Sequence, residues 1–204
     1  MSEKKYKNPN ITISKVFTKK GDSGKTELIG KKNISKHDIR VKAYGQLDHL
    51  NAVVGGCVAE IEKLKIENKE VLELLDILES LQHKIFNLGN MLATVDTSLL
   101  EHMPQINDDD LNNLENNIEK YNAQLPSLSS FVLPGGSMIN IWFNLSRTET
   151  RKCERIIVEM HSAYPVKEIV LKYINRLSDA FFVWGRWINF NMNINEKTWD
   201  SNKG

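Results

Sequence analysis

The feature that most limits the possible folds is a repeat of apolar residues every three or four positions, which persists through most of the chain. An α-helix turns once in about 3.6 residues, so this spacing places the apolar side chains on one helix face. Five segments carry the pattern: residues 38–67, 70–94, a shorter segment from 108, 137–161 and 166–191. Amphipathic helices of this length bury their apolar faces against one another. The pattern therefore predicts an all-α fold, a five-helix bundle.

The segments between and around these helices define the domain expected. Residues 11–34 are rich in glycine and lysine and have no helical period, which predicts a loop that can include a short β-strand. Residues 95–107 break the helical pattern and form a segment too long for a tight turn. This segment could serve as a lid over a site or as a mobile connection, and the sequence does not decide between the two. We expect a disordered lead-in over residues 1–10, one domain over 11–191 and a flexible C-terminal tail over 192–204.

Composition excludes several classes of protein. The 27 basic and 26 acidic residues leave a formal charge of +1, so we expect no broad basic surface for nucleic acid. No apolar run approaches the ~20 residues of a membrane span, and the polar N-terminal residues lack a signal-peptide core. The only two cysteines, Cys57 and Cys153, are far apart and fit buried free thiols in a reducing compartment. We expect a cytoplasmic protein, or a mitochondrial matrix protein if a longer precursor exists.

The segment Thr18–Thr26 combines glycines, whose amides can converge on an anion, with lysines that supply charge. Its Gly-Lys-Thr ending invites a Walker A interpretation. That motif needs a glycine five residues before Gly24, where Lys19 stands, and no helix begins at Thr26. Taken alone, the loop is a weak indication of phosphate binding.

Two of the expected helices carry polar faces. One face of the segment 137–161 holds Arg147, Arg151, Glu154 and Arg155. One face of the segment 166–191 holds Asn175, Asp179, Phe182 and Arg186. With Asp48 on the first helix, these faces could pair with each other, with another subunit or with a triphosphate, and periodicity does not choose among them. No His, Cys or carboxylate spacing resembles a zinc or di-iron site, so we expect no metal held by protein ligands alone.

Three blocks of sequence carry a more specific signal. The first is Phe17–Thr26 followed by Arg40–Asn51, the second is Phe131–Gly136 followed by Arg147–Arg155, and the third is Asn175–Asp179. In this order and at these separations, the blocks resemble those of the PduO-type ATP:cob(I)alamin adenosyltransferases. The resemblance extends from Phe17 to about Asn189.

The resemblance implies a ferritin-like, cobalamin adenosyltransferase-like bundle, assembled as a homotrimer with active sites between subunits. An N-terminal Gly-rich nucleotide-binding loop would wrap the triphosphate of ATP, with Mg²⁺ held mainly through the ATP. The loop residues so implied are Thr18, Lys19, Gly21, Asp22, Gly24, Thr26 and Lys31. On the facing helices, ATP would be contacted by Arg151, Glu154 and Asn175.

The same resemblance implies the roles of residues that bind cobalamin. These are Phe131, Phe182, Asp179 and Arg186, and the implied catalytic set is Phe131, Arg147, Arg151 and Asp48. Phe131 would lie beneath the corrin and, with Phe182, keep water and the lower axial ligand from cobalt, which makes Co(II) easier to reduce. Arg147 would pair with Asp48 of a neighbouring subunit. Reduced cobalt would then attack ATP, forming adenosylcobalamin and releasing triphosphate, with a cobalamin reductase and an adenosylcobalamin-dependent enzyme as partners.

The chain departs from the family pattern at three positions. Lys152 stands where an arginine is common, His49 replaces a glutamate and Asn144 replaces a histidine. Lysine keeps the charge but loses bidentate geometry, so phosphate affinity or trimer stability would be reduced. Two rival interpretations are a carrier that binds ATP and corrinoid and delivers adenosylcobalamin, and a structural bundle whose polar faces only mediate oligomerisation.

Overall fold

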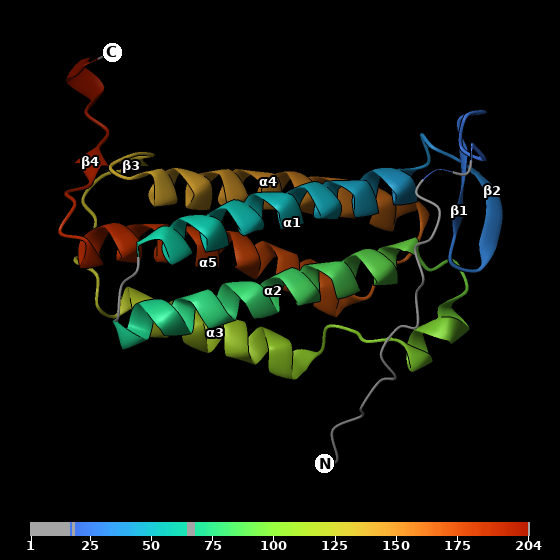
Figure 1. The fold of residues 1–204 in the computed structure, drawn as a ribbon, viewed down its shortest axis with the longest axis horizontal. Coiled ribbons are helices and arrows are strands. Elements are labelled where there is room, and N and C mark those ends of the chain that lie inside the picture. Colours follow the sequence, from blue (N-terminus) through green and yellow to red (C-terminus); the bar gives the residue numbers. More distant parts are fainter. Residues whose placement is uncertain (1–16, 18, 65–67, 204) are drawn as a thin grey trace.

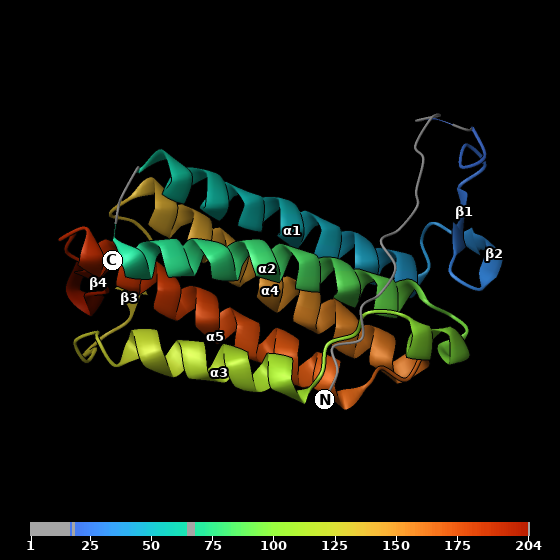
Figure 2. The same ribbon diagram turned by 60° about the horizontal axis from the view of Figure 1, so that its bottom comes forward.

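The computed structural model describes residues 17, 19–64 and 68–203, so the expected lead-in over residues 1–10 lies outside the described residues. Long helices packed side by side make up most of the described chain (Figures 1 and 2). The five predicted helices are α1 (Ile39–Lys63), α2 (Lys69–Ala93), α3 (Asp108–Asn122), α4 (Met138–Ala163) and α5 (Glu168–Asn191). The prediction of a helical bundle is confirmed. No helix in the described part of the chain has the length and apolar content needed to cross a membrane.

Side-chain caps fix where four of these helices begin. Asp38 accepts a hydrogen bond of 2.8 Å from the amide of Arg40, ahead of α1. Asn107 and Asp110 exchange hydrogen bonds with each other's backbone amides, which forms a capping box at α3. The caps of α2 and α4 are Asn68 and Ser137.

The start of α5 differs from the predicted one. The helix begins at Glu168 rather than at Val166, and its N-terminal residue has no side-chain cap. The amide of Val166 donates instead to Nδ1 of His161, 3.0 Å away at the end of α4. Val166 therefore belongs to the turn between the two helices.

Helix α4 packs against both α1 and α5. Helix α2 packs on α1, and α3 packs on α5. The α4–α5 contact is close because Gly185 has no side chain: a Cβ there would lie 2.9 Å from the Cβ of Phe143. The largest fully buried side chains include Trp184, Trp187 and Tyr121.

Both cysteines are free and buried, as predicted. The Sγ atom of Cys57 lies 3.5 Å from the hydroxyl of Ser146, and the Cys153 thiol donates to the backbone carbonyl of Gln46 at 3.4 Å. Burial disfavours the thiolate and raises the pKa of each thiol to about 12.

Two short antiparallel strand pairs lie at opposite ends of the bundle (Figures 1 and 2). The pair at one end is β1 (Lys25–Leu28) with β2 (Lys31–Ser35). The pair at the other end is β3 (Val132–Leu133) with β4 (Lys197–Thr198). Helix α1, with 25 residues, is about 37 Å long, which sets the scale of their separation.

The segment between α2 and α3 contains the 3₁₀ helix η1 (Thr97–His102), whose Leu100 is buried. Just before it, the amide of Val95 donates to the carbonyl of Ile29, which joins the β1–β2 hairpin to the end of α2. Arg40 donates to the carbonyls of Leu92 and Thr94 at 2.9 and 3.2 Å. These bonds satisfy carbonyls that the end of α2 leaves without a helical partner.

The C-terminal segment, expected as a flexible tail over residues 192–204, carries secondary structure up to Lys203, and its flexibility stays a prediction. Strand β4 pairs with β3, and a second 3₁₀ helix, η2 (Ser201–Lys203), follows it. Glu196 forms an ion pair with Arg186 of α5, with 2.9 Å between Oε1 and Nε. The segment is held by backbone pairing and one ion pair, and neither produces a repeat of apolar residues that the sequence could reveal. This packing was therefore not predicted. The boundaries of the domain over residues 11–191 stay a prediction.

Candidate functional site

The Gly-rich loop and the β1–β2 hairpin surround a polar hollow of about 470 Å³. It is lined by Lys20, Gly21, Ser23, Lys25, Thr26, Glu27 and Asn33. The amide of Gly24 donates to the carbonyl of Gly21, and Gly24 has a φ of +75°, so the turn needs a residue that tolerates the left-handed region. A tight turn with exposed lysines and hydroxyls around it suits a polyanion.

The predicted loop residues occupy different places around this hollow. Gly21 and Thr26 line it. Lys19, Asp22 and Gly24 lie in the exposed turn beside it, and Lys31 is exposed at the start of β2. Thr18 lies outside the described residues, so its role stays a prediction.

Lys36 was not predicted as a loop residue. A Cβ on Gly21 would lie 2.9 Å from Nζ of Lys36, so the ammonium group lies directly over this glycine. The amide of Lys36 also donates to the carbonyl of Gly24 at 2.9 Å. Lys36 follows β2 in sequence, and only the pairing of Lys25 with Ser35 brings it back to the loop. No local motif could have indicated this contact.

The polar faces of α4 and α5 meet in a helix-face cluster of Arg147, Arg151, Glu154 and Asn175. The side-chain amide of Asn175 donates to Oε1 of Glu154 at 2.8 Å, which links the two helices. Arg151 is exposed next to this pair. The three side chains predicted to contact ATP therefore lie on one accessible surface.

Arg147 differs from Arg151, the other cation of the cluster, because it is partly buried. Its Nε atom is buried and has no hydrogen-bond partner among the described residues. Burial lowers the pKa of its guanidinium from the ordinary value, and the neighbouring charge of Arg151 lowers it further. Burial of the Nε atom without a partner is costly, so this position favours a hydrogen-bond acceptor from outside the described residues.

A second hollow, of about 660 Å³, lies beside Arg147, and we call it the aromatic hollow. It is lined by Leu128, Ser129, Ser130, Phe131, Val132, Asn144, Arg147, Phe182 and Trp199. Phe131 is 81% exposed, and Phe182 is half-buried beneath the guanidinium of Arg186, 5.9 Å from ring centroid to Cζ. The hollow has the size and apolar lining that a large flat ligand requires.

Asp179 and Arg186, also predicted to bind cobalamin, are not among the residues that line the aromatic hollow. Asp179 accepts a hydrogen bond of 3.2 Å from Arg176. Arg186 is 5% exposed and donates to Glu196 and to the carbonyl of Pro126. Its guanidinium is thus engaged within the chain, and direct contact of these two residues with cobalamin stays a prediction.

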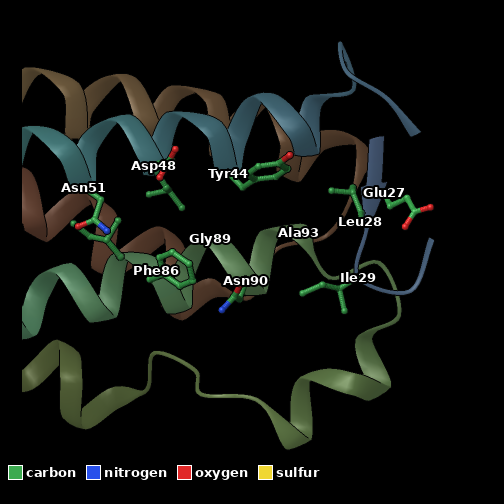
Figure 3. Close-up of a pocket in the computed structure, with 12 residues that line it drawn as sticks. Glu27, Leu28, Ile29, Tyr44, Asp48, Asn51, Phe86, Gly89, Asn90 and Ala93 are labelled. Carbon is green, nitrogen blue, oxygen red and sulfur yellow. The ribbon is translucent and has the colours of Figure 1, made fainter. Parts of the chain in front are cut away.

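Asp48 lies apart from Arg147 in the described chain. It lines a third hollow of about 310 Å³ between α1, α2 and the turn of the β1–β2 hairpin. Figure 3 shows Asp48 and Tyr44 of α1 facing Phe86 of α2 across this hollow. Phe86 is 64% exposed, so the hollow is open and apolar with a carboxylate at its edge.

Two of the departures from the family pattern meet at one carboxylate. Nζ of Lys152 lies 3.6 Å, and Nε2 of His49 lies 3.9 Å, from Oε2 of Glu149. Gln46 donates to the same oxygen at 2.6 Å. The third departure, Asn144, lines the aromatic hollow and donates to Oδ1 of Asn140. Lys152 and His49 therefore act on the α1–α4 contact rather than on either ligand hollow.

The described residues contain no group of three or more His, Cys, Asp or Glu side chains placed to hold a metal ion. The loop hollow offers one carboxylate, Glu27, and the hydroxyls of Ser23 and Thr26. These few oxygen ligands fit a Mg²⁺ ion that takes most of its ligands from phosphate groups and water.

Comparison with known proteins places the chain in a family. The profile described as "Cobalamin adenosyltransferase" matches residues 16–188. The chain is 36% identical over 182 residues to the corrinoid adenosyltransferase of Bacillus subtilis, covering 89% of this chain and 90% of that protein. It is 34% identical over 172 residues to a corrinoid adenosyltransferase of Citrobacter freundii, covering 84% and 93%.

A solved structure agrees with these sequence relatives. It is that of a variant PduO-type ATP:corrinoid adenosyltransferase from Lactobacillus reuteri in complex with cobalamin and ATP. The two share 33% identity and a TM-score of 0.82 over 92% of this chain and 97% of that one. With the profile covering most of its length and relatives above 30% identity, the chain belongs to the cobalamin adenosyltransferase family.

Proposed function

We propose that this chain transfers the 5′-deoxyadenosyl group of ATP to the reduced cobalt of cobalamin, with release of triphosphate. One observation carries the proposal: the aromatic hollow and the helix-face cluster share Arg147, so a site for a flat ligand adjoins a site for an anion. Transfer from ATP to a corrinoid requires this adjacency because the two reactants must meet. The names of the relatives and the ligands of the Lactobacillus reuteri structure support the same reaction.

The chemistry needs no nucleophile from the protein. Co(I) supplies an electron pair to the 5′ carbon of ATP and this pair becomes the Co–C bond, while the C5′–O bond breaks and triphosphate leaves with the electron pair of that bond. Cobalt ends as Co(III). The chain's part is to hold the two substrates in line and to stabilise the negative charge that develops on the leaving oxygen. Arg147 and Arg151 would supply the positive charge for the second task.

The substrates divide between the clusters. The loop hollow, with Lys19 and Lys36 beside it, would hold the triphosphate, and Arg151, Glu154 and Asn175 would contact ATP from the facing helices. Bound with ATP, Mg²⁺ would neutralise part of the phosphate charge. Phe131 and Phe182 would cover the lower face of cobalamin and exclude water and an axial ligand from cobalt.

We propose a homotrimer with the site between copies, and the separation of the two halves of the site within one chain supports this proposal. The Gly-rich loop and the aromatic hollow lie at opposite ends of the bundle, so one chain alone separates the two halves of the site (Figure 1). A neighbouring copy can bring its loop to the helix-face cluster. The unpartnered Arg147 and the exposed Asp48 would then pair across the interface, and Phe86 would be covered.

The reaction also bears on location and partners. Co(I) is oxidised easily, so a reductase must supply the electron, and an adenosylcobalamin-dependent enzyme must use the product. A reducing compartment such as the cytoplasm suits Co(I) and suits the two free thiols.

Anaerobic incubation of the protein with chemically reduced cobalamin, ATP and Mg²⁺ tests the proposal. We expect the Co(I) absorption band to disappear while adenosylcobalamin and triphosphate form in equal amounts. Tight binding of both substrates without product would support the carrier interpretation instead. Failure to bind either substrate would leave only a structural role.

A further inference from the structure

The position of Phe131 is set by its main chain rather than by its side chain. At 81% exposure the ring has almost no packing of its own to hold it. Its carbonyl accepts a hydrogen bond of 2.7 Å from the amide of Trp199. The hydroxyl of Ser130 donates to the carbonyl of Trp199 at 2.8 Å. The C-terminal segment therefore holds the backbone on which Phe131 stands.

An ion pair within the bundle anchors this segment. The side chains of Arg186 and Glu196 are 6% and 18% exposed, and the guanidinium donates to both carboxylate oxygens at 2.9–3.1 Å. The same guanidinium donates to the carbonyl of Pro126 at 3.0 Å. One residue of α5 thus ties down both the C-terminal segment and the chain that leads to Phe131.

The glycine turn after Phe131 is shaped to receive the C-terminal segment. Gly136 has a φ of +90°, and a Cβ there would lie 2.8 Å from Cγ2 of Ile194. Asn189 donates from its side chain to the carbonyl of Gly135 and accepts at its own carbonyl from the amide of Ile194. The turn and the segment are therefore packed together independently of the ion pair.

We propose that Arg186 and Glu196 are positioning residues for the corrinoid half of the site. Their ion pair holds the C-terminal segment on β3, so that Phe131 and Trp199 stay in place as walls of the aromatic hollow. Neither residue touches the substrate in this role. The proposal rests on the proposed function of the hollow, but the anchoring itself does not depend on it.

A purely structural role for the pair makes a different prediction. Removing one charge of a buried pair leaves the other without a partner, which loosens whatever the pair holds. If the pair only stabilised the bundle, the binding of ATP and of cobalamin would weaken together. If it positions the hollow, only the corrinoid side should respond, because the Gly-rich loop lies at the other end of the bundle (Figure 2).

The test compares Glu196→Gln with the full-length wild type by hydrogen exchange and by steady-state kinetics. We expect the Trp199 amide to exchange at least about tenfold faster and the KM for reduced cobalamin to rise at least about tenfold. The KM for ATP should stay within about twofold. Glu73→Gln is the matched control, because Glu73 pairs with Lys120 at 2.6 Å between α2 and α3, and it should change none of these values.

A second variant guards against misfolding of the first. Ile194→Ala loosens the segment at Gly136 without touching the ion pair, and it should shift both readouts in the same direction. Unchanged exchange at Trp199, or equal rises in both KM values, would overturn the proposal. If the wild type forms no adenosylcobalamin, the proposed function fails, and equilibrium affinities for cobalamin and ATP replace the KM values in the same comparison.

Discussion

Phe131 has the largest exposed fraction among the large apolar side chains of the described residues. Such exposure contributes little to folding, so its retention at the edge of the aromatic hollow calls for a functional reason. Phe131→Ala should change the free energy of unfolding by no more than about 0.5 kcal/mol. It should lower the rate of adenosylcobalamin formation from Co(II) cobalamin and a reductant at least about tenfold, because water or a lower ligand on cobalt makes Co(II) harder to reduce. Urea unfolding and an anaerobic assay that starts from Co(II) cobalamin measure the two effects.

This role would be contradicted if the free energy of unfolding fell by as much as the activation free energy rose, about 1.4 kcal/mol for a tenfold loss of rate. Leu72→Ala on α2 is the matched control, since Leu72 is also exposed, at 48%, and does not line the aromatic hollow. It should leave both quantities near those of the wild type.

The two buried thiols give the fold a dependence on alkaline pH. A thiol is neutral when protonated, and burial favours that form, so the pKa of Cys57 and of Cys153 rises from 9.0 to about 12. Between these values the unfolded chain loses the protons that the folded chain keeps. The contribution of each protonated thiol to the free energy of unfolding is therefore fully present below about pH 9. It is lost as pH rises toward 12, by up to about 1.4 kcal/mol per pH unit for each thiol.

Urea midpoints measured between pH 8 and pH 11 would reveal this slope. Cys57→Ala should make the slope shallower, because one of the buried groups whose pKa is raised on folding is gone. A slope identical to that of the wild type would show that folding does not raise the pKa of the Cys57 thiol.

At the level of elements, a close contact between α1 and α4 depends on one glycine. A Cβ on Gly56 would lie 2.5–2.7 Å from the ring of Trp142, whereas a Cβ on Gly45, also in α1, would meet no heavy atom within 4 Å. Gly56→Ala should destabilise the protein by about 1–3 kcal/mol through overpacking. Gly45→Ala should stabilise it by up to about 1 kcal/mol through helix propensity. Equal effects in urea unfolding would mean that α1 does not pack on α4 as described.

The helices were predictable because their signals are local. Apolar spacing marks the buried faces, and residues such as Asp38 and Ser137 mark where α1 and α4 begin. The turn at Val166 was not predictable, because its amide bonds to a histidine side chain of the preceding helix. The pairing of β3 with β4 joins residues more than sixty positions apart, and neither strand is long enough to show an alternating pattern.

The candidate site shows the same division. Periodicity placed Arg147, Arg151 and Glu154 on one face of α4, and the structure has them there. Lys36, Trp199 and Glu196 were missed, because each reaches the site through a fold-back of the chain rather than through a motif. Arg186 was grouped with the ligand-binding residues on helix periodicity and family resemblance, yet its charge is neutralised by a residue of the C-terminal segment.

For the whole molecule, the arrangement of one chain sets a limit on what it can do alone. The Gly-rich loop and the aromatic hollow lie at opposite ends of helices about 37 Å long. The buried Nε of Arg147 has no partner among the described residues, and Asp48 is exposed on another face. A closed ring of identical copies would join each loop to the next helix-face cluster and repeat the same contact around the ring. The active site would then belong to pairs of copies rather than to one chain.

Subunit complementation tests this claim most directly. Lys19→Ala in the loop and Arg151→Ala in the helix-face cluster should each abolish most of the activity of a homotrimer. After the two inactive variants are mixed, unfolded and refolded together, mixed trimers should each contain one interface with both wild-type residues, and roughly a quarter of the wild-type activity should return. No recovery, with mixed trimers demonstrated by mass, would contradict a site shared between copies.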